Sequence, residues 1–214
     1  MHEVQFGYLR RPVHATRPYD AARFEVCNQK WSALTEEGRG FAILNDSKYG
    51  VNVESNSINL TLLKASLAPD MYADKGAQEF TYSFYFWNGA FIDSGVTRAG
   101  YELNVPVTQA GGNAGEKSII EIGGKNIIIE SVKSAEDNSG DIIVRLYESA
   151  RNAASSMVRV NIPFTRVVVS DMLEKEKYEI KSESGEFALH FNAFEIKTIR
   201  LVMSSESKRS TKRF

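Results

Sequence analysis

Short runs of β-branched and aromatic residues, separated by Gly, Asn, Asp and Ser, recur along nearly the whole chain. In the first half, residues 57–63, 80–86 and 101–105 alternate apolar and polar positions with a period of two, which is typical of half-buried strands. Residues 41–44 are uniformly apolar and predict a buried strand that ends at a turn-forming Asn-Asp pair. The first half of the chain therefore predicts β-structure.

The same pattern continues after residues 108–115, a stretch of small residues that predicts a linker or a long loop. Gly123-Gly124 predicts a hairpin turn between the first two strands that follow. Helical signal is weak, and only single turns are predicted, at residues 18–23 and 171–177. Many short strands with turn signals between them indicate an all-β sandwich. The strands predicted beyond the linker are residues 117–121, 126–132, 141–148, 156–162, 165–173, 186–191 and 194–201.

Charge and composition exclude several classes of function. The net charge of −1 gives no general attraction to nucleic acid or to an anionic membrane, so neither is an expected partner. No apolar window is long enough for a membrane span, and the first residues do not form a signal peptide. Cys27 is the single cysteine, which favours a cytoplasmic setting, and its thiol is expected to be buried. Residues 204–214 carry four basic side chains among serines and predict a disordered tail.

Motifs for catalysis are missing from the sequence. The three histidines, His2, His14 and His190, are scattered and form no pair with the spacing of metal ligands, so no metal site is expected in this chain. There is no G-x-S-x-G motif, and Cys27 has no histidine near it in sequence. The glycine-rich residues 111–117 lack the spacing of a phosphate-binding loop. We therefore expect no catalytic residue, cofactor or metal site in these 214 residues.

The most suggestive polar segment is L-N-D-S-K-Y-G at residues 44–50. Glycosidases need two carboxyl groups about 5–9.5 Å apart, but spacing in a sequence does not show which carboxylates converge. One interpretation of the segment is a tight turn between strands, because Asn, Asp and Gly tolerate positive φ. The other is a polar loop that reaches a sugar through Asp46, Lys48 or Tyr49.

Five segments, in order along the chain, resemble the glycoside hydrolase family 38 α-mannosidases of the cytosolic and bacterial type. They are V-Q-F-G-Y-L-R-R-P-V-H (residues 4–14), R-F-E-V with K-W (23–26 and 30–31), L-N-D-S-K-Y-G (44–50), D-K-G with E-F-T-Y (74–76 and 79–82) and F-E-I-K-T-I-R-L (194–201). The sequence departs from the family at Tyr19, Gln29 and Ser47, where Trp, His and Cys are common. The framework residues of the pattern are kept better than the polar ones.

The resemblance implies a larger enzyme. Family 38 enzymes are retaining exo-glycosidases that release α-linked mannose, with the nucleophilic Asp and a divalent metal on an N-terminal α/β barrel domain. Residues 1–110 would then be the C-terminal part of the central antiparallel β-sandwich, or supersandwich, and residues 118–203 a small terminal β-sandwich. A divalent metal is expected in the full-length enzyme and none in this chain. Its expected partners are the rest of the α-mannosidase polypeptide and, through it, α-mannosides.

Three functions follow as hypotheses. The first is a non-catalytic β-region that completes the α-mannosidase fold and its substrate cleft, with Asn45, Asp46, Lys48 and Tyr49 as cleft candidates. The alternative is a stand-alone carbohydrate-binding sandwich, in which Trp87, Tyr85 and Tyr49 stack on sugars, although alternating aromatics more often form a core. The third is an oligomerising domain, because apolar strands left exposed would favour a homo-oligomer.

Overall fold

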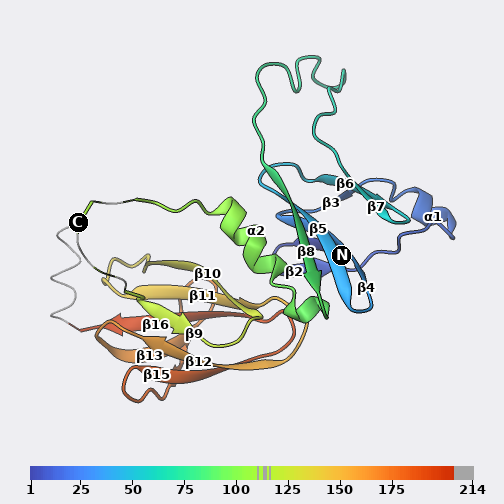
Figure 1. The fold of residues 1–214 in the computed structure, drawn as a ribbon. Coiled ribbons are helices and arrows are strands. Elements are labelled where there is room, and N and C mark those ends of the chain that lie inside the picture. The colour runs from blue at the N-terminus through green and yellow to red at the C-terminus, as the bar shows by residue number, and fades with distance from the viewer. Residues whose placement is uncertain (110, 113–114, 116, 205–214) are drawn as a thin grey trace. The chain divides into compact units, whose positions relative to one another are not determined.

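The computed structural model describes residues 1–109, 111–112, 115 and 117–204, and its ribbon is drawn in Figure 1. Two compact units make up the chain, unit 1 (Met1–Gln109) and unit 2 (Ala110–Phe214), and each is described by itself. Of the tail predicted to be disordered, only Ser204 lies among the described residues. No helix in the described part of the chain is long and apolar enough to cross a membrane.

Unit 1 is built around a five-stranded antiparallel sheet in the order β2-β1-β4-β5-β8. Its strands are β1 His2–Val4, β2 Gly7–Leu9, β4 Trp31–Glu36, β5 Arg39–Asn45 and β8 Tyr82–Asn88. A three-stranded sheet in the order β3-β6-β7 contains β3 Val26–Cys27, β6 Gly50–Glu54 and β7 Ser57–Leu60. The helical segments are α1 Pro18–Ala21, the 3-10 helix η1 Phe91–Asp93 and α2 Val96–Asn104.

An aromatic cluster covers one face of the five-stranded sheet. Between ring centroids, Phe91 lies 5.0 Å from Tyr8, 5.6 Å from Trp31 and 6.2 Å from Trp87. Gly40 on β5 pairs with Trp87 on β8, and a Cβ at position 40 would overlap the Trp87 ring. A glycine at this position therefore lets the indole lie directly against the backbone of β5.

The strand predicted at residues 101–105 is wrong, because these residues lie at the end of α2. Val96 and Gly100, four residues apart, are the buried residues of this helix. A Cβ on Gly100 would lie 3.0 Å from Cδ1 of Trp31, so the helix packs closely against β4. Asn104 donates from Nδ2 to the carbonyl oxygen of Gly100 at 2.8 Å and closes the last turn. Packing against Trp31, and not the short alternation, decides the structure here.

Unit 2 is an antiparallel β-sandwich of two sheets. The five-stranded sheet has the order β10-β11-β16-β13-β14, with β10 Ile127–Ser134, β11 Ile142–Glu148, β16 Ile196–Met203, β13 Phe164–Ser170 and β14 Glu176–Ile180. The three-stranded sheet has the order β15-β12-β9, with β15 Glu186–Phe191, β12 Ala154–Val160 and β9 Ile120–Ile122.

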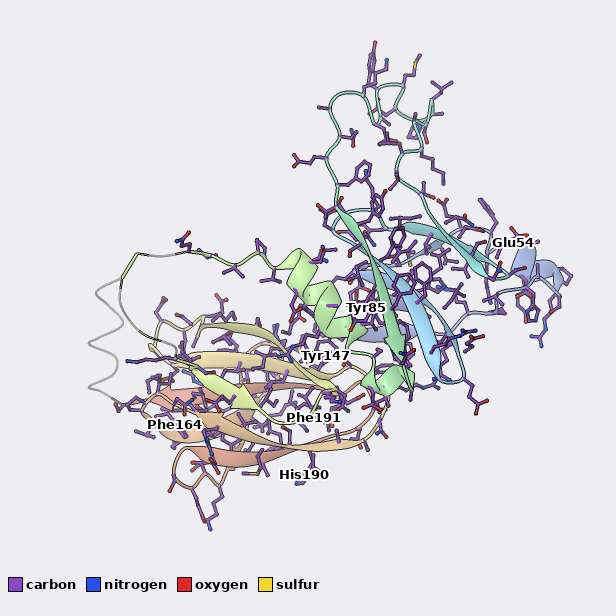
Figure 2. All side chains as sticks on the ribbon, viewed as in Figure 1. Glu54, Tyr85, Tyr147, Phe164, His190 and Phe191 are labelled. Atoms are coloured by element: carbon purple, nitrogen blue, oxygen red, sulfur yellow. The ribbon has the colours of Figure 1, made fainter. Side chains whose placement is uncertain are left out.

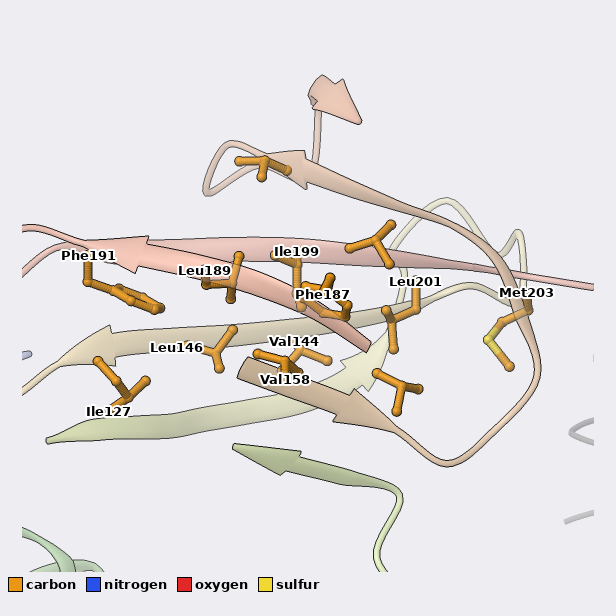
Figure 3. Packing of buried hydrophobic residues seen from close by; sticks show 13 residues of the cluster. Ile127, Val144, Leu146, Val158, Phe187, Leu189, Phe191, Ile199, Leu201 and Met203 are labelled. Atoms are coloured by element: carbon orange, nitrogen blue, oxygen red, sulfur yellow. The ribbon is translucent and has the colours of Figure 1, made fainter. Parts of the chain in front are cut away.

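One hydrophobic cluster forms the core of unit 2, and both sheets contribute to it (Figure 3). Alternate residues of the strands point into it, as expected for strands with one buried face. Its buried members are Ile127, Val144, Leu146, Val158, Val160, Val167, Val169, Phe187, Leu189, Phe191, Ile199, Leu201 and Met203. The all-β sandwich expected from the alternating pattern is thus confirmed for this unit.

Two local predictions in unit 2 are wrong. Gly123-Gly124 does not close a hairpin, because β9 pairs with β12 and β10 pairs with β11, so the chain crosses between the two sheets at this point. The helical turn predicted at residues 171–177 is a tight turn that leads into β14. Oδ1 of Asp171 accepts hydrogen bonds from the backbone N–H groups of Leu173 at 2.9 Å and Lys175 at 3.0 Å, which replaces helical bonding there.

A buried carboxylate organises one end of the unit 2 sandwich. Glu148, at the end of β11, is fully buried. Its Oε1 accepts from Nδ2 of Asn126 at 2.9 Å and from the backbone N–H of Ala150 at 2.7 Å. Its Oε2 accepts from the backbone N–H groups of Asn152 at 3.1 Å and Phe194 at 3.0 Å. Each oxygen therefore accepts one hydrogen bond from the loop directly after β11 and one from a residue distant in sequence, Asn126 or Phe194.

We expect Glu148→Gln to destabilise unit 2 by about 2–4 kcal/mol, because an amide NH2 would replace one acceptor oxygen and leave two part-buried donors unpaired. Native-state hydrogen exchange of the β11 amides measures this free energy. Glu183→Ala is the matched control, since Glu183 forms an exposed ion pair with Lys181 and should change the free energy of unfolding by less than about 1 kcal/mol. Equal effects of the two substitutions would contradict the role given to Glu148.

Candidate functional site

Asn45 lies at the end of β5 and is buried, with only 1% of its surface exposed. Its Nδ2 donates to Oδ1 of Asn28 at 3.0 Å and to the carbonyl oxygen of Gln29 at 2.8 Å. Its Oδ1 accepts from the backbone N–H of Lys48 at 2.8 Å, which closes the turn that follows β5. Asn45 therefore holds the turn from inside.

Asp46 joins this turn to the residue before β8. Its Oδ2 accepts from the backbone N–H of Thr81 at 2.9 Å, and its own N–H donates to the carbonyl oxygen of Thr81 at 3.2 Å. Its Oδ1 accepts from Oγ of Ser47 at 2.8 Å. The hydrogen bond from the Thr81 backbone is the main cause that lowers the pKa of Asp46 below the usual 3.8. Asp46 is therefore a carboxylate at neutral pH.

Lys48 and Tyr49 form the outer part of the turn. Nζ of Lys48 lies 4.9 Å from the centroid of the Phe80 ring, a cation–π contact. The side chain of Tyr49 is 55% exposed, while its carbonyl oxygen accepts from the backbone N–H of Asn28 at 2.9 Å. Of the four cleft candidates, Asp46, Lys48 and Tyr49 reach the surface and Asn45 does not.

The segment between β7 and β8 contributes further charged groups that the sequence alone did not select. Oδ2 of Asp74 accepts from the backbone N–H groups of Ala65 at 2.8 Å and Lys64 at 3.2 Å. These two hydrogen bonds are the main causes that lower the pKa of Asp74, and the positive charge of Lys48 adds to them. Glu25 forms an ion pair with Lys64 and accepts from Oγ1 of Thr61 at 2.5 Å.

Three of the segments that resemble family 38 therefore meet in unit 1. The R-F-E-V segment supplies Glu25, the L-N-D-S-K-Y-G turn supplies Asp46 and Lys48, and the D-K-G and E-F-T-Y segment supplies Asp74 and Thr81. The available signal for Glu25 and Asp74 in the sequence was that each belongs to one of the segments that resemble family 38. Only the fold shows that they share one set of contacts.

Of the three aromatic residues predicted to stack on sugars, Trp87 is buried and Tyr85 is partly buried. Trp87 is 8% exposed and belongs to the aromatic cluster. Tyr85, labelled in Figure 2, donates from its hydroxyl to the carbonyl oxygen of Ser94 at 2.6 Å. Tyr49 is thus the one member of the three with most of its ring accessible.

Other candidate groups do not belong to this turn. Cys27 is exposed, which contradicts its expected burial, because it lies on the two-residue strand β3, where little covers its side chain. His190 lies on β15 in unit 2, where its Nδ1 is 2.8 Å from Oγ of the cross-strand Ser155 (Figure 2). Within the described residues, no group of three or more His, Cys, Asp and Glu side chains is arranged to hold a metal ion.

A surface pocket of about 420 Å³ lies elsewhere in unit 1 and contains no residue of this turn in its lining. Its lining carries charges of both signs, from Arg11 and Arg23 and from Asp20 and Glu54. His2 also borders it, and burial, with the nearby N-terminus and Arg11, lowers the pKa of this histidine to about 4. His2 is therefore neutral at physiological pH, and its Nδ1 lies 3.0 Å from Oγ of Ser32.

Comparison with known proteins identifies the family. The model of the glycosyl hydrolases family 38 C-terminal domain matches residues 1–72, and that of the family 38 C-terminal beta sandwich domain matches residues 126–199. The chain belongs to the C-terminal region of glycosyl hydrolase family 38. The resemblance stated on five sequence segments is thus confirmed, and the two family 38 matches fall in different units.

The curated relatives of this family 38 region are longer proteins. Alpha-mannosidase 2C1 of Homo sapiens is 34% identical over 210 residues, and alpha-mannosidase G of Dictyostelium discoideum is 35% identical over 211 residues. Each match covers 94% of this chain but only 20% and 19% of the relatives. The chain therefore spans about a fifth of the length of these α-mannosidases.

A solved structure shows the same fold. The crystal structure of an alpha-mannosidase from Enterococcus faecalis V583 matches with a TM-score of 0.75 at 17% identity. The match covers 94% of this chain and 24% of that one. The all-β architecture of this family 38 region is therefore shared by a protein with little sequence identity to it.

Asp46 gives a test that depends on pH. Because its pKa is lowered in the folded protein, its hydrogen bonds stabilise unit 1 fully above the ordinary pKa of 3.8 and are lost as the pH falls through the lower folded pKa. We expect Asp46→Asn to be less stable than the wild type at pH 6, with a difference that shrinks as the pH falls below about 4. Urea unfolding followed by tryptophan fluorescence reports unit 1, which holds both tryptophans of the chain. A difference that stays constant from pH 6 to pH 3 would contradict this.

Proposed function

We propose that this chain is a non-catalytic C-terminal β-region of an α-mannosidase, which completes the fold of the enzyme that hydrolyses terminal α-linked mannose. The observation that carries the proposal is the match of both units to family 38 C-terminal models, together with a length of about a fifth of the α-mannosidase relatives. The nucleophile and a divalent metal would then be supplied by the rest of the polypeptide. The single cysteine supports a cytoplasmic setting for this enzyme.

The carboxylates in and near the turn are not suited to act as a general acid. A glycosidase needs one carboxyl group with a raised pKa to protonate the leaving oxygen. Glu25, Asp46 and Asp74 all have pKa values below the usual ones, because hydrogen bonds stabilise their charged forms, to which a lysine charge adds for Glu25 and Asp74. Such carboxylates hold loops and accept hydrogen bonds from sugar hydroxyls, but they are poor general acids.

The turn at Asn45 is the part of unit 1 best suited to line a substrate cleft. Asn45 fixes its backbone from inside, and Asp46 ties it to the start of β8. Lys48 and Tyr49 are thereby presented at the surface on a rigid support. We infer that Asp46, Lys48 and Tyr49 contribute the cleft-facing groups and that Asn45 positions them.

The proposal is tested with a chimera in which this chain replaces the matched region of the human relative. The chimera should hydrolyse an aryl α-mannoside, whereas the same relative without the region should lose activity. The isolated chain, with Zn²⁺ or Co²⁺ added, should show no turnover above the buffer rate. Enzyme-like turnover by the isolated chain would overturn the non-catalytic role, and a folded but inactive chimera would overturn the assignment to an α-mannosidase.

The alternative is a stand-alone carbohydrate-binding module, and of the three aromatic residues named for it Tyr49 is the one that is mostly exposed. Stacking on this single ring should bind sugar weakly, so we expect no binding heat when the isolated chain is titrated with mannose oligosaccharides at millimolar concentration. Isothermal titration calorimetry measures this. Heat of binding that disappears in Tyr49→Ala, and persists in the unit 2 control Tyr178→Ala, would favour the module instead.

A further inference from the structure

β8 is an edge strand whose only partner in its sheet, within the described residues, is β5. The backbone groups on its other side are therefore free of a neighbouring strand. Proteins usually protect such edges with charged residues, proline or a β-bulge. The sequence of β8, Y-S-F-Y-F-W-N, contains no charge and no proline, and its register with β5 runs from Asn88 to Tyr82 without a shift.

The edge strands of the large sheet in unit 2 show the contrast. β14 reads E-K-Y-E-I, with three charged residues, and its pairing with β13 contains a register shift. β10 carries Glu130 and Lys133, and its pairing with β11 is also shifted. The chain thus protects both of these edges and leaves β8 unprotected.

An aromatic strip lies along the unprotected strand. We define the strip as Phe41, Tyr82, Phe84 and Phe86. Tyr82, Phe84 and Phe86 are alternate residues of β8 and are 50%, 59% and 72% exposed. Phe41 on β5 pairs with Phe86, and its ring centroid lies 5.2 Å from that of Phe86 and 6.1 Å from that of Phe84. A pocket of about 390 Å³ that includes Phe41 and Phe86 adjoins the strip.

The strip differs from the other side of the same strand. Tyr85 and Trp87, which point to the opposite face, are covered by the aromatic cluster and by a hydrogen bond to Ser94. One face of β8 is therefore packed and the other carries three large exposed rings. Three exposed rings of this size on one face of a strand form an apolar surface of the kind that marks an interaction site.

We propose that β8 and the aromatic strip receive a β-strand from the part of a family 38 α-mannosidase that lies outside this chain. This inference rests on the proposed function. About four-fifths of each curated relative lies outside the matched region, so enough polypeptide is available to cover the strip. The added strand would pair with the free backbone edge of β8 and alternate apolar with polar residues, its apolar side chains covering Phe84 and Phe86.

The chemistry of the strip disfavours a sugar as its occupant. A sugar site needs several converging polar groups beside a stacking ring, and the strip offers a single hydroxyl, that of Tyr82. A second copy of this chain could also cover the strip, and a measurement of mass would detect it. Both are outcomes of the test.

Hydrogen exchange on the 214-residue chain and on the chimera with the human relative tests the inference. In the isolated chain the amides of β8 that point away from β5 should exchange rapidly. In the chimera they should be protected by at least about tenfold, as expected for newly paired strand amides. A folded chimera in which β8 exchanges as fast as in the isolated chain overturns the inference, even if that chimera hydrolyses mannosides.

Charge substitutions on the strip give the second measurement. Phe84→Lys should remove most of the added protection of β8 in the chimera and leave the unfolding of the isolated chain almost unchanged, because the ring is exposed there. The matched control is Leu173→Lys in unit 2, because Leu173 is an apolar residue that is 77% exposed and lies outside the strip. This control should change neither the protection of β8 in the chimera nor the unfolding of the isolated chain. Equal effects of the two substitutions overturn the inference.

Two further outcomes would identify another occupant. A stable dimer of the isolated chain in sedimentation, abolished by Phe84→Lys, would assign the strip to a second copy. Protection of β8 already present in the monomeric isolated chain would show that the strip is covered within this polypeptide. Either result overturns the inference and leaves the proposed function standing, because activity of the chimera is measured separately.

Discussion

The hydrogen bonds of Asn45 are the constraint on which the rest of unit 1 depends. The Asn45 side chain is buried and makes three hydrogen bonds. They join it to the backbone of Gln29 before β4, to the side chain of Asn28 and to the backbone of Lys48. Nδ2 of Asn104 adds a bond to the carbonyl oxygen of Asn45 at 3.0 Å, so the end of α2 is tied to the same point. Strand, turn and helix therefore meet at one buried residue, through its side-chain amide and its main-chain carbonyl, which fixes where Asp46 and Lys48 lie.

The alternating pattern predicted most strands because one face of each is buried. β7 and β8 of unit 1 and the strands of unit 2 other than β14 were predicted with boundaries moved by a few residues, and β5 was predicted from a uniformly apolar run. The strands β1, β2, β3, β4 and β6 were not predicted. The pattern failed where long-range packing decides the structure. Residues 101–105 alternate like a strand but belong to a helix held against Trp31. The exposed strand β14 was missed because charged residues occupy most of it.

The candidate site was predictable in part. The turn residues were found from a motif of polar and turn-forming residues, and the structure shows Asp46 and Lys48 at the surface of that turn. Their partners Thr81 and Asp74 come from a segment some 30 residues later, and no local pattern indicates that pairing. Gly123-Gly124 illustrates the same limit, because the sequence of a turn does not show whether the next strand joins the same sheet.

The exposure of Cys27 has a practical consequence. It is the only cysteine of the chain, and it pairs with Gly50, the last residue of the L-N-D-S-K-Y-G turn segment. Its neighbour Asn28 bonds both to Asn45 and to Tyr49. A thiol-specific spin label or fluorophore attached to the natural sequence would therefore sit next to the turn at a single defined position, and would report its local environment without any engineered cysteine.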